Sequence, residues 1–392
     1  MGFTAALPHA LGRDARYYAQ VESTPGTFVR ATGGGAFKAK KFGLSYDIAR
    51  EYRTDNRASR SEYEQITGKE KVDWEIEGYL IPSGSAGTAP DMGEIFQALM
   101  GSETVTPATS VAYGLNNTQS GRQTLSMTRY MSVFMDQLRG CIVTSGKISG
   151  KGSDPFMCSF KGRAYGATFT GNSTLDGAVV ASATNIVEAV DQYSFEPHAT
   201  HGSIVMVGAN DNTNTGYMVT GRSGATLTLE ATLSAADAAD VLPFAPAETV
   251  SGSPIGGIVG SLSLDSVSIP ITGFEVEIDN QDVIIEDEVG QPGMTDAIPG
   301  MRKISGSFDV RIRRDQVRIL GHRKNSSFTT RAVSIVIGST AGRICTVSMP
   351  QIEVTFSSPE VPDGSDSVTC NIPFRALASS GSATDEISIV FT

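Results

Sequence analysis

The chain has 392 residues and is acidic, with a formal net charge of -11 at pH 7. This balance excludes a nucleic-acid-binding surface built on clustered Lys and Arg, which such proteins need to neutralise phosphates. An apolar fraction of 40% excludes a disordered chain, and the length allows two or three domains with cores of their own. Alternating apolar and polar runs and 42 glycines favour an all-β fold.

Residues 1–35 are expected to form an N-terminal arm. Within it, residues 16–21 have the pattern of a short strand, and residues 22–27 (ESTPGT) predict a turn with Pro25 and Gly26 at its apex. Residues 1–11 lack the basic and apolar regions of a signal peptide, and no run approaches the ~20 apolar residues of a membrane span. We expect the arm to dock on a neighbouring subunit.

A repeat organises the rest of the chain. Residues 139–143 (RGCIV) return as 343–347 (RICTV), and a cysteine lies five residues before an Arg-Ala pair at both 163–164 and 375–376. The repeat therefore pairs all four cysteines: Cys141 with Cys345, and Cys158 with Cys370. Its period is far longer than the roughly 20–50 residues of a solenoid repeat. The sequence predicts a duplicated domain, with copies at 36–180 and 251–392.

Each copy has two strands joined by a long segment, at 50–70 in the first copy and 280–302 in the second. The first segment carries charges of both signs, among them Arg50, Arg53, Arg57, Arg60, Glu62 and Glu64. The second is chiefly acidic and holds the apolar residues Val283, Ile284 and Ile285, followed by Glu286, Asp287 and Glu288. Long segments of this kind are either solvated loops or functional ones. We favour interaction arms, because both copies keep the length and the apolar triplet needs a surface to bury against.

Two further elements complete the predicted organisation. Each copy continues into a short helix, at 94–100 and at 315–320. Residues 181–250 have no counterpart in either copy, and strands at 202–208, 217–220 and 225–229 indicate a small inserted β-barrel or sandwich that faces outward.

The sequence offers no catalytic, cofactor or metal site. Free, buried cysteines are favoured over a Cys141–Cys158 bridge mirrored by Cys345–Cys370, and the lack of a CxxC pair argues against a four-cysteine zinc site. His198 and His201 fall in a segment that reads as an exposed loop. The only tryptophan, Trp74, lies in an alternating strand and is expected to pack in a core or an interface.

With these features, the chain resembles the tail tube (major tail) proteins of long-tailed bacteriophages. The likeness covers both copies. It rests on residues 21–27 (VESTPGT), the strand, long loop and strand of 44–80, the helix at 94–100 and the strands through Cys141 and Cys158. The resemblance implies a β-sandwich whose sheet joins neighbours into a ring around a continuous β-barrel. It also implies that the long loops reach the next ring and that an electronegative lumen lets DNA slide through.

Family rings usually present six tube domains, so two copies in one chain predict a trimer with pseudo-six-fold symmetry. The expected function is a virion tail tube of stacked rings, assembled in the host bacterial cytoplasm, that conducts DNA during ejection. Expected partners are further copies of the chain and the tail tip, baseplate and terminator proteins, without a membrane. Two alternatives stay open: another phage tail or capsid component (terminator, baseplate ring or decoration) and a carbohydrate-binding adhesin.

Overall fold

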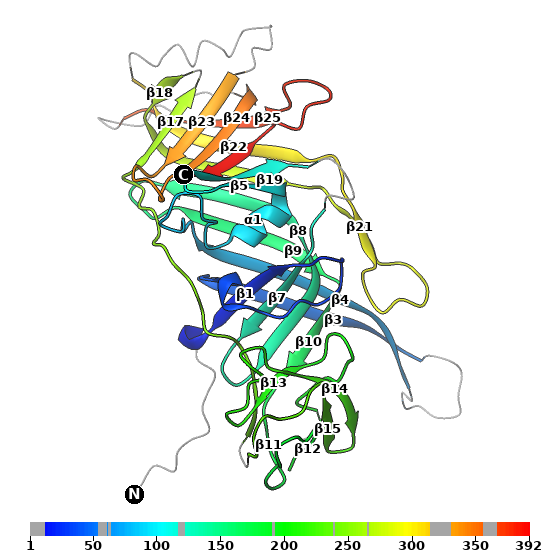
Figure 1. Cartoon of the computed structure of the whole chain (residues 1–392). Coiled ribbons are helices and arrows are strands. Elements are labelled where there is room, and N and C mark those ends of the chain that lie inside the picture. The colour runs from blue at the N-terminus through cyan, green and yellow to red at the C-terminus, as the bar shows by residue number, and fades with distance from the viewer. Residues whose placement is uncertain are drawn as a thin grey trace, which may run out of the picture.

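The computed structural model describes residues 12–53, 61, 64–116, 122–189, 193–237, 240–264, 266–313, 331–355 and 367–392. Strands dominate these residues, and a single α-helix, α1 (Gly93–Met100), accompanies them. The all-β prediction is confirmed. Figure 1 shows the second copy at one end, the first copy in the middle and the inserted unit at the other end.

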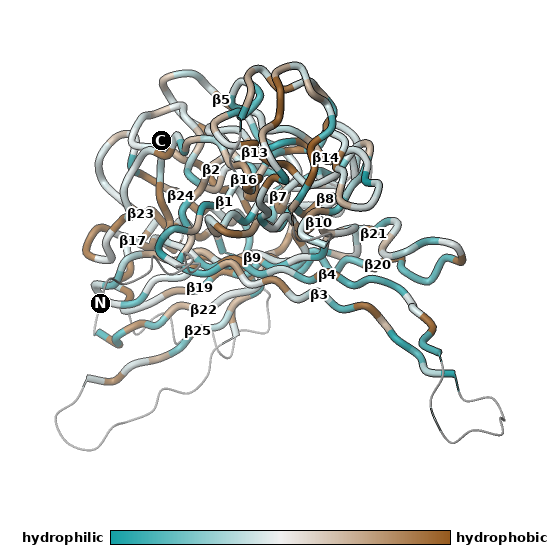
Figure 2. Tube along the Cα trace, turned by 90° about the horizontal axis from the view of Figure 1, so that it is seen from below, coloured by the Kyte–Doolittle hydropathy of each residue, from teal (hydrophilic) through white to brown (hydrophobic). Residues whose placement is uncertain are grey.

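One continuous antiparallel sheet runs through both copies. Its strands follow the order β3 (Lys41–Tyr52), β4 (Gln65–Tyr79), β9 (Met157–Ala164), β8 (Met135–Lys151), β19 (Ile271–Asp279), β22 (Lys303–Arg311), β25 (Thr369–Leu377) and β24 (Cys345–Val354). Alternate residues bury one face in the core and leave a polar face, as a period of two requires. Seen from below, the sheet arches under the body of the molecule (Figure 2).

A second layer covers the apolar face. Its strands are β1 (Arg16–Val21), β2 (Ala36–Phe37), β5 (Gly101–Thr106), β6 (Ser110–Leu115), β7 (Leu125–Tyr130), β10 (Gly166–Thr170), β17 (Gly260–Leu264), β18 (Val267–Ile269), β23 (Arg331–Ile337) and β26 (Ser388–Phe391). The first halves of β8 and β24 belong to this layer, so both strands cross from one layer to the other. Helix α1 buries Ile95, Phe96 and Leu99 in the core and ends at Gly101, whose φ of 98° suits glycine. The predicted helix at 94–100 is confirmed, and the one at 315–320 lies outside the described residues.

The strand registers show the duplication residue by residue. Asp47 pairs with Lys71 in the first copy, and the same residue types pair at Asp279 and Lys303 in the second. At the next matched position, Trp74 lies opposite Gly162 and Gly306 lies opposite Phe374. A Cβ atom on Gly162 would lie 2.4 Å from the Trp74 ring, and one on Gly306 would lie 2.5 Å from the Phe374 ring. Each aromatic ring therefore needs a glycine opposite it. The aromatic residue lies on the first strand of the pair in the first copy and on the second strand in the second copy.

These registers confirm one cysteine correspondence and correct the other. Cys158 pairs with Gly78 and Cys370 with Val310, which are matched positions. Cys345, however, pairs with the last residue of β26, and the residue that pairs with the last residue of β10 is Met135. Cys345 thus corresponds to Met135 and not to Cys141. Side chains on a strand return to the same face every second residue. A short apolar sequence pattern can therefore recur at a shifted position on the same buried face.

All four cysteines are free and buried, as predicted. Burial raises the pKa of the Cys158 thiol to about 12 and also raises the pKa values of Cys141 and Cys345. They are packing residues of the core rather than reactive thiols.

The inserted unit forms a separate small sheet with its own core. Its strands are β11 (Ser173–Thr174), β12 (Asn185–Val187), β13 (Ile204–Val207), β14 (Tyr217–Ser223), β15 (Thr226–Leu229) and β16 (Asp240–Pro243). The strands predicted near 202–208, 217–220 and 225–229 are confirmed as β13, β14 and β15. Because β11 pairs with β16, the unit includes residues that lie before the boundary at 181 predicted from the repeat.

The described part of the N-terminal arm docks on its own chain. Strand β1 pairs with β7 and β2, and Tyr18 donates a hydrogen bond to the carbonyl oxygen of Pro246 at 2.5 Å. Phe28 packs against Phe244 and Met135, and Arg30 forms an ion pair with Glu230 of the inserted unit. The strand at 16–21 is confirmed, and docking of the arm on a neighbouring subunit stays a prediction.

Candidate assembly surfaces

The two copies are joined edge to edge by β8 and β19. Seven residue pairs run from Gly273 opposite Lys151 to Asp279 opposite Ser145. The copies are therefore not two separate domains on a linker, because their sheets add into one. A second ladder joins them on the other layer, where β26 of the second copy pairs with β6 of the first.

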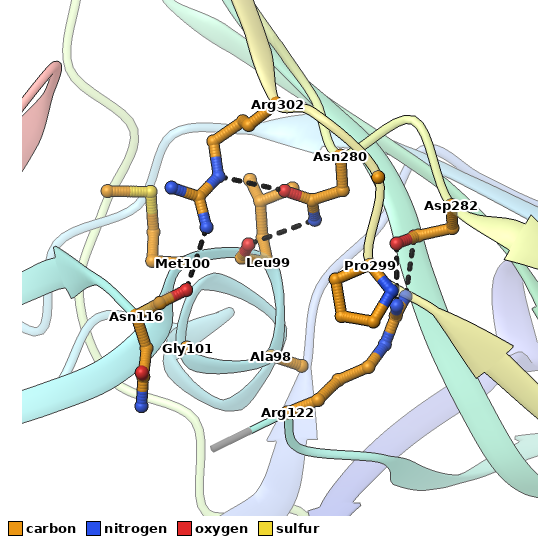
Figure 3. Close-up of a pocket in the computed structure, with 11 residues that line it drawn as sticks. Ala98, Leu99, Met100, Gly101, Asn116, Arg122, Asn280, Asp282, Pro299 and Arg302 are labelled. Carbon is orange, nitrogen blue, oxygen red and sulfur yellow. Dashed lines mark hydrogen bonds and ion pairs between the residues drawn. The ribbon is translucent and has the colours of Figure 1, made fainter. Parts of the chain in front are cut away.

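A polar cluster fixes this seam at the end of α1 (Figure 3). The Asn280 side chain donates to the carbonyl oxygens of Leu99 and Val143, each at 3.1 Å, and accepts from Arg302 at 3.2 Å. Arg302 also donates to the Asn116 carbonyl oxygen at 2.9 Å. The carbonyl of Leu99 is one of the acceptors that a helix end leaves without a partner, so the second copy caps the helix of the first.

Beside this cluster lies a buried ion pair between Arg122 and Asp282. Both terminal nitrogens of the Arg122 guanidinium contact the carboxylate at 2.5 Å, and the Asp282 side chain is fully buried. A bidentate pair out of water is strong only while both partners remain. The sequence showed Asp282 as part of an acidic segment but not its partner, since the two residues are 160 positions apart.

The long segment of the second copy is a docked hairpin rather than a loop. It contains β20 (Val283–Ile285) paired with β21 (Asp296–Ile298). Ile284 packs with Ile142 and Tyr165 of the first copy. Several residues named from the sequence lie on β20 or in the loop that joins it to β21: Val283, Ile284, Ile285, Glu286, Asp287 and Glu288.

Polar contacts hold the hairpin of β20 and β21 in place. Glu286 forms an ion pair with Arg163 at 2.6 Å, and Lys69 donates to the carbonyl oxygens of Glu286 and Glu288. These contacts are lateral and lie within one chain. On the outward side of the hairpin, Val283 and Ile298 form a cross-strand pair and are 59% and 44% exposed.

The long segment of the first copy is an extended hairpin that projects from the sheet (Figure 1). Strand β3 continues to Tyr52 and β4 begins at Gln65, so much of the expected loop is strand. Arg50 lies exposed on β3, and Arg53 and Glu64 form an ion pair at 2.7 Å. Arg57, Arg60 and Glu62 lie outside the described residues.

Strand β3 is the open end of the large sheet. Among the residues that the structure describes, it pairs with β4 alone. Its counterpart β19 pairs on both sides, with β22 and with β8. Because an open strand edge presents unpaired backbone N–H and C=O groups, β3 is a surface ready to add another strand.

The polar face of the large sheet carries charges of both signs. The basic residues are Lys41, Arg50, Lys69, Lys71, Lys147, Lys151, Lys161, Arg163, Lys303, Arg311 and Arg375. The acidic residues are Asp47, Asp73, Glu75, Glu77, Glu275, Glu277, Asp279, Asp309 and Glu353. Several form cross-strand ion pairs, among them Lys147 with Glu275 at 2.7 Å. The acidic excess of the whole chain is therefore not concentrated on this face.

The described residues hold no cluster of three His, Cys, Asp or Glu side chains suited to a metal. His198 and His201 stack with ring centroids 3.4 Å apart, and burial lowers the pKa of His201 to about 4. Trp74 is buried in the core, as expected. No helix in the described ranges has the length and apolar character to span a membrane.

Comparison with known families agrees with this architecture. The chain matches a family described as phage tail tube protein twice, over residues 12–220 and 214–376. No curated protein matches it. The family consists of structural proteins of the phage tail and is not an enzyme class, and two matches in one chain support the tandem duplication. The chain therefore belongs to the phage tail tube protein family and is a structural component of the virion tail.

Proposed function

We propose that three copies of this chain close into a ring and that the rings stack into the tail tube through which DNA leaves the virion. The observation that carries the proposal is the ladder between β8 and β19. It shows that a tube domain of this protein adds to the next one by sheet extension. The same step repeated between chains would join the second copy of one chain to the open edge of β3 in the next.

Closing the sheet removes its open edges, which is the general advantage of a barrel over an open sheet. In a closed ring, the arch of the sheet (Figure 2) would turn its polar face toward the lumen. Because basic and acidic side chains alternate on that face, a DNA duplex passing along it meets no continuous basic track to bind. Two tube domains in each chain and six in a family ring make the closed ring a trimer.

Stacking needs a second, axial contact, and rings joined head to tail propagate into a filament. The outward pair of Val283 and Ile298 is an exposed apolar surface suited to this contact. A terminator or a baseplate ring would need the lateral seam but not an axial surface that repeats. The finished tube would meet tail tip, baseplate and terminator proteins at its ends after assembly in the host cytoplasm.

Electron microscopy of the concentrated, purified protein, with mass measurement of its soluble form, tests the proposal. Trimeric rings or hollow tubes with a pore wide enough for duplex DNA are the expected result. A protein that stays monomeric at every concentration would contradict it and would favour a decoration or adhesin role.

Val283→Asp should weaken the stacking of rings and leave each ring closed. The substitution places a charge on an apolar surface that stacking would bury, and an unpaired buried charge is strongly unfavourable. The fraction of protein in tubes, measured by sedimentation, should fall sharply. Val105→Asp is the matched control, since Val105 is 50% exposed on β5. Tubes of normal stability from Val283→Asp would show that the axial contact lies elsewhere.

A further inference from the structure

Strands β10 and β26 occupy the same place in the two copies. Each pairs antiparallel with the first half of the long crossing strand of its copy, so that Thr170 lies opposite Met135 and Phe391 lies opposite Cys345. Each also follows the strand that lies next in the large sheet, β9 or β25. Residues 168–170 of β10 therefore correspond to residues 389–391 of β26.

The outer edges of these two strands have different partners. Residues 389–391 of β26 pair with residues 111–113 of β6, which belongs to the other copy and helps close the seam within the chain. The β10 edge is instead covered by residues 194–203 of the inserted unit, starting with a bridge between Thr170 and Phe195. The inserted unit thus fills the position on β10 that a hairpin from the adjacent tube domain fills on β26.

The cover on β10 is complete at the corresponding residues. Ser203 donates to the Phe169 carbonyl oxygen at 2.7 Å, and Thr168 donates to the His201 carbonyl oxygen at 2.9 Å. Burial raises the pKa of the Glu196 carboxylate, and a hydrogen bond from the backbone of Phe169 opposes this increase. The inserted unit therefore occupies this edge of β10, as β6 occupies the edge of β26.

This position lies at the end of the molecule where the next chain would join. Strand β10 is on the β9 side of β8, away from the second copy, and Figure 1 shows the inserted unit beyond it. The open strand β3 lies at the same end. Residues 196–200 are exposed, and burial raises the pKa of Tyr46 on β3, with smaller contributions from the carboxylates of Glu70 and Glu196.

We infer that residues 196–200 of the inserted unit contact the second copy of the neighbouring chain and form the outer layer of the seam between chains. The inference rests on the proposed ring. The inserted unit is then part of the ring wall and not only an outward decoration. The ring also has two kinds of seam in alternation: one closed by β6 and β26 within a chain, and one closed by the inserted unit between chains.

Site-directed photo-crosslinking of the full chain tests this inference. Ala199→Cys is labelled with a benzophenone maleimide, which reacts at this site alone because the four native cysteines are buried. After assembly and irradiation, we expect a covalent dimer of chains on a denaturing gel. Ser223→Cys is the matched control, because it is exposed at the end of β14 in the same unit and should give no dimer.

The outcomes separate the inference from the function on which it rests. Rings that form normally but give no dimer from the label at 199 would overturn the inference and leave the ring proposal intact. A dimer of equal yield from both labelled positions would also overturn it, because contact would not be confined to this segment. If the unlabelled chain forms no rings, the proposed function fails and this inference fails with it.

Discussion

Tyr46→Pro should leave the chain folded and prevent ring formation. In β19, the N–H groups of even-numbered residues face β8, as the bond from Asn280 to the Thr144 carbonyl oxygen at 2.9 Å shows. The matched pairs of Asp279 with Lys303 and Asp47 with Lys71 make Tyr46 the counterpart of Ile278, which lies opposite Gly146. The N–H group of Tyr46 therefore points out of the open edge of β3, where a neighbouring chain would accept it.

Proline has no N–H group to donate, and its ring blocks an approaching strand, but an open edge tolerates it in the isolated chain. Each seam would lose a ladder hydrogen bond of about 0.5–1.5 kcal/mol in addition to the steric clash. Since about 1.4 kcal/mol corresponds to tenfold in an equilibrium constant, we expect association at least about tenfold weaker. Analytical ultracentrifugation across a concentration series measures this shift.

Tyr46→Ala is the matched control, because it removes the same side chain, 50% exposed, and keeps the N–H group. It should form rings at nearly the concentration that the unmodified chain needs. If both variants assemble alike, the edge of β3 does not form the ring seam. If both lose assembly, the tyrosine side chain rather than the backbone edge carries the contact.

How much of this architecture the sequence predicted depends on how local each signal was. The alternating strands, the helix at 94–100 and the strands of the inserted unit follow from spacing within a few residues, and all are present. The duplication was also visible, because the pattern around Cys158 and Cys370 survives in both copies at matched registers. The similar sequences around Cys141 and Cys345 suggested a wrong correspondence, since short apolar strands resemble one another at several shifts.

The contacts that join the copies could not be predicted from local pattern. The pair of Arg122 and Asp282 and the ladder between β6 and β26 bring together residues far apart in the chain, and only the closed sheet places them side by side. The arm at 280–302 was recognised as an interaction element. This segment packs against its own chain because the edge of β8 lies next to β19, and no spacing rule reveals that arrangement.

The turn at 22–27 had a clear signature, but the role of its first residue emerged only from the fold. Glu22 is 6% exposed, and its carboxylate accepts four hydrogen bonds of 2.7–2.8 Å. The donors are the N–H groups of Gly26 and Gly140 and the hydroxyls of Thr124 and Ser126. This single side chain therefore ties the arm to β7 and β8.

Glu22→Ala should be the most destabilising of these substitutions. It leaves four donors without their acceptor, and each buried unsatisfied group costs about 1–3 kcal/mol before water and relaxation recover part of it. We expect the free energy of unfolding, measured by urea titration of the unassembled chain, to fall by about 3 kcal/mol or more. The free energy of unfolding of Glu22→Gln should lie between those of the unmodified chain and of Glu22→Ala. An amide keeps one acceptor oxygen but turns an N–H group toward the donors. Glu77→Ala, at an exposed position on β4, is the control and should change stability by no more than about 0.5 kcal/mol. A loss from Glu22→Ala as small as that of the control would mean that water replaces the carboxylate, and the arm would then be held by the β1–β7 ladder alone.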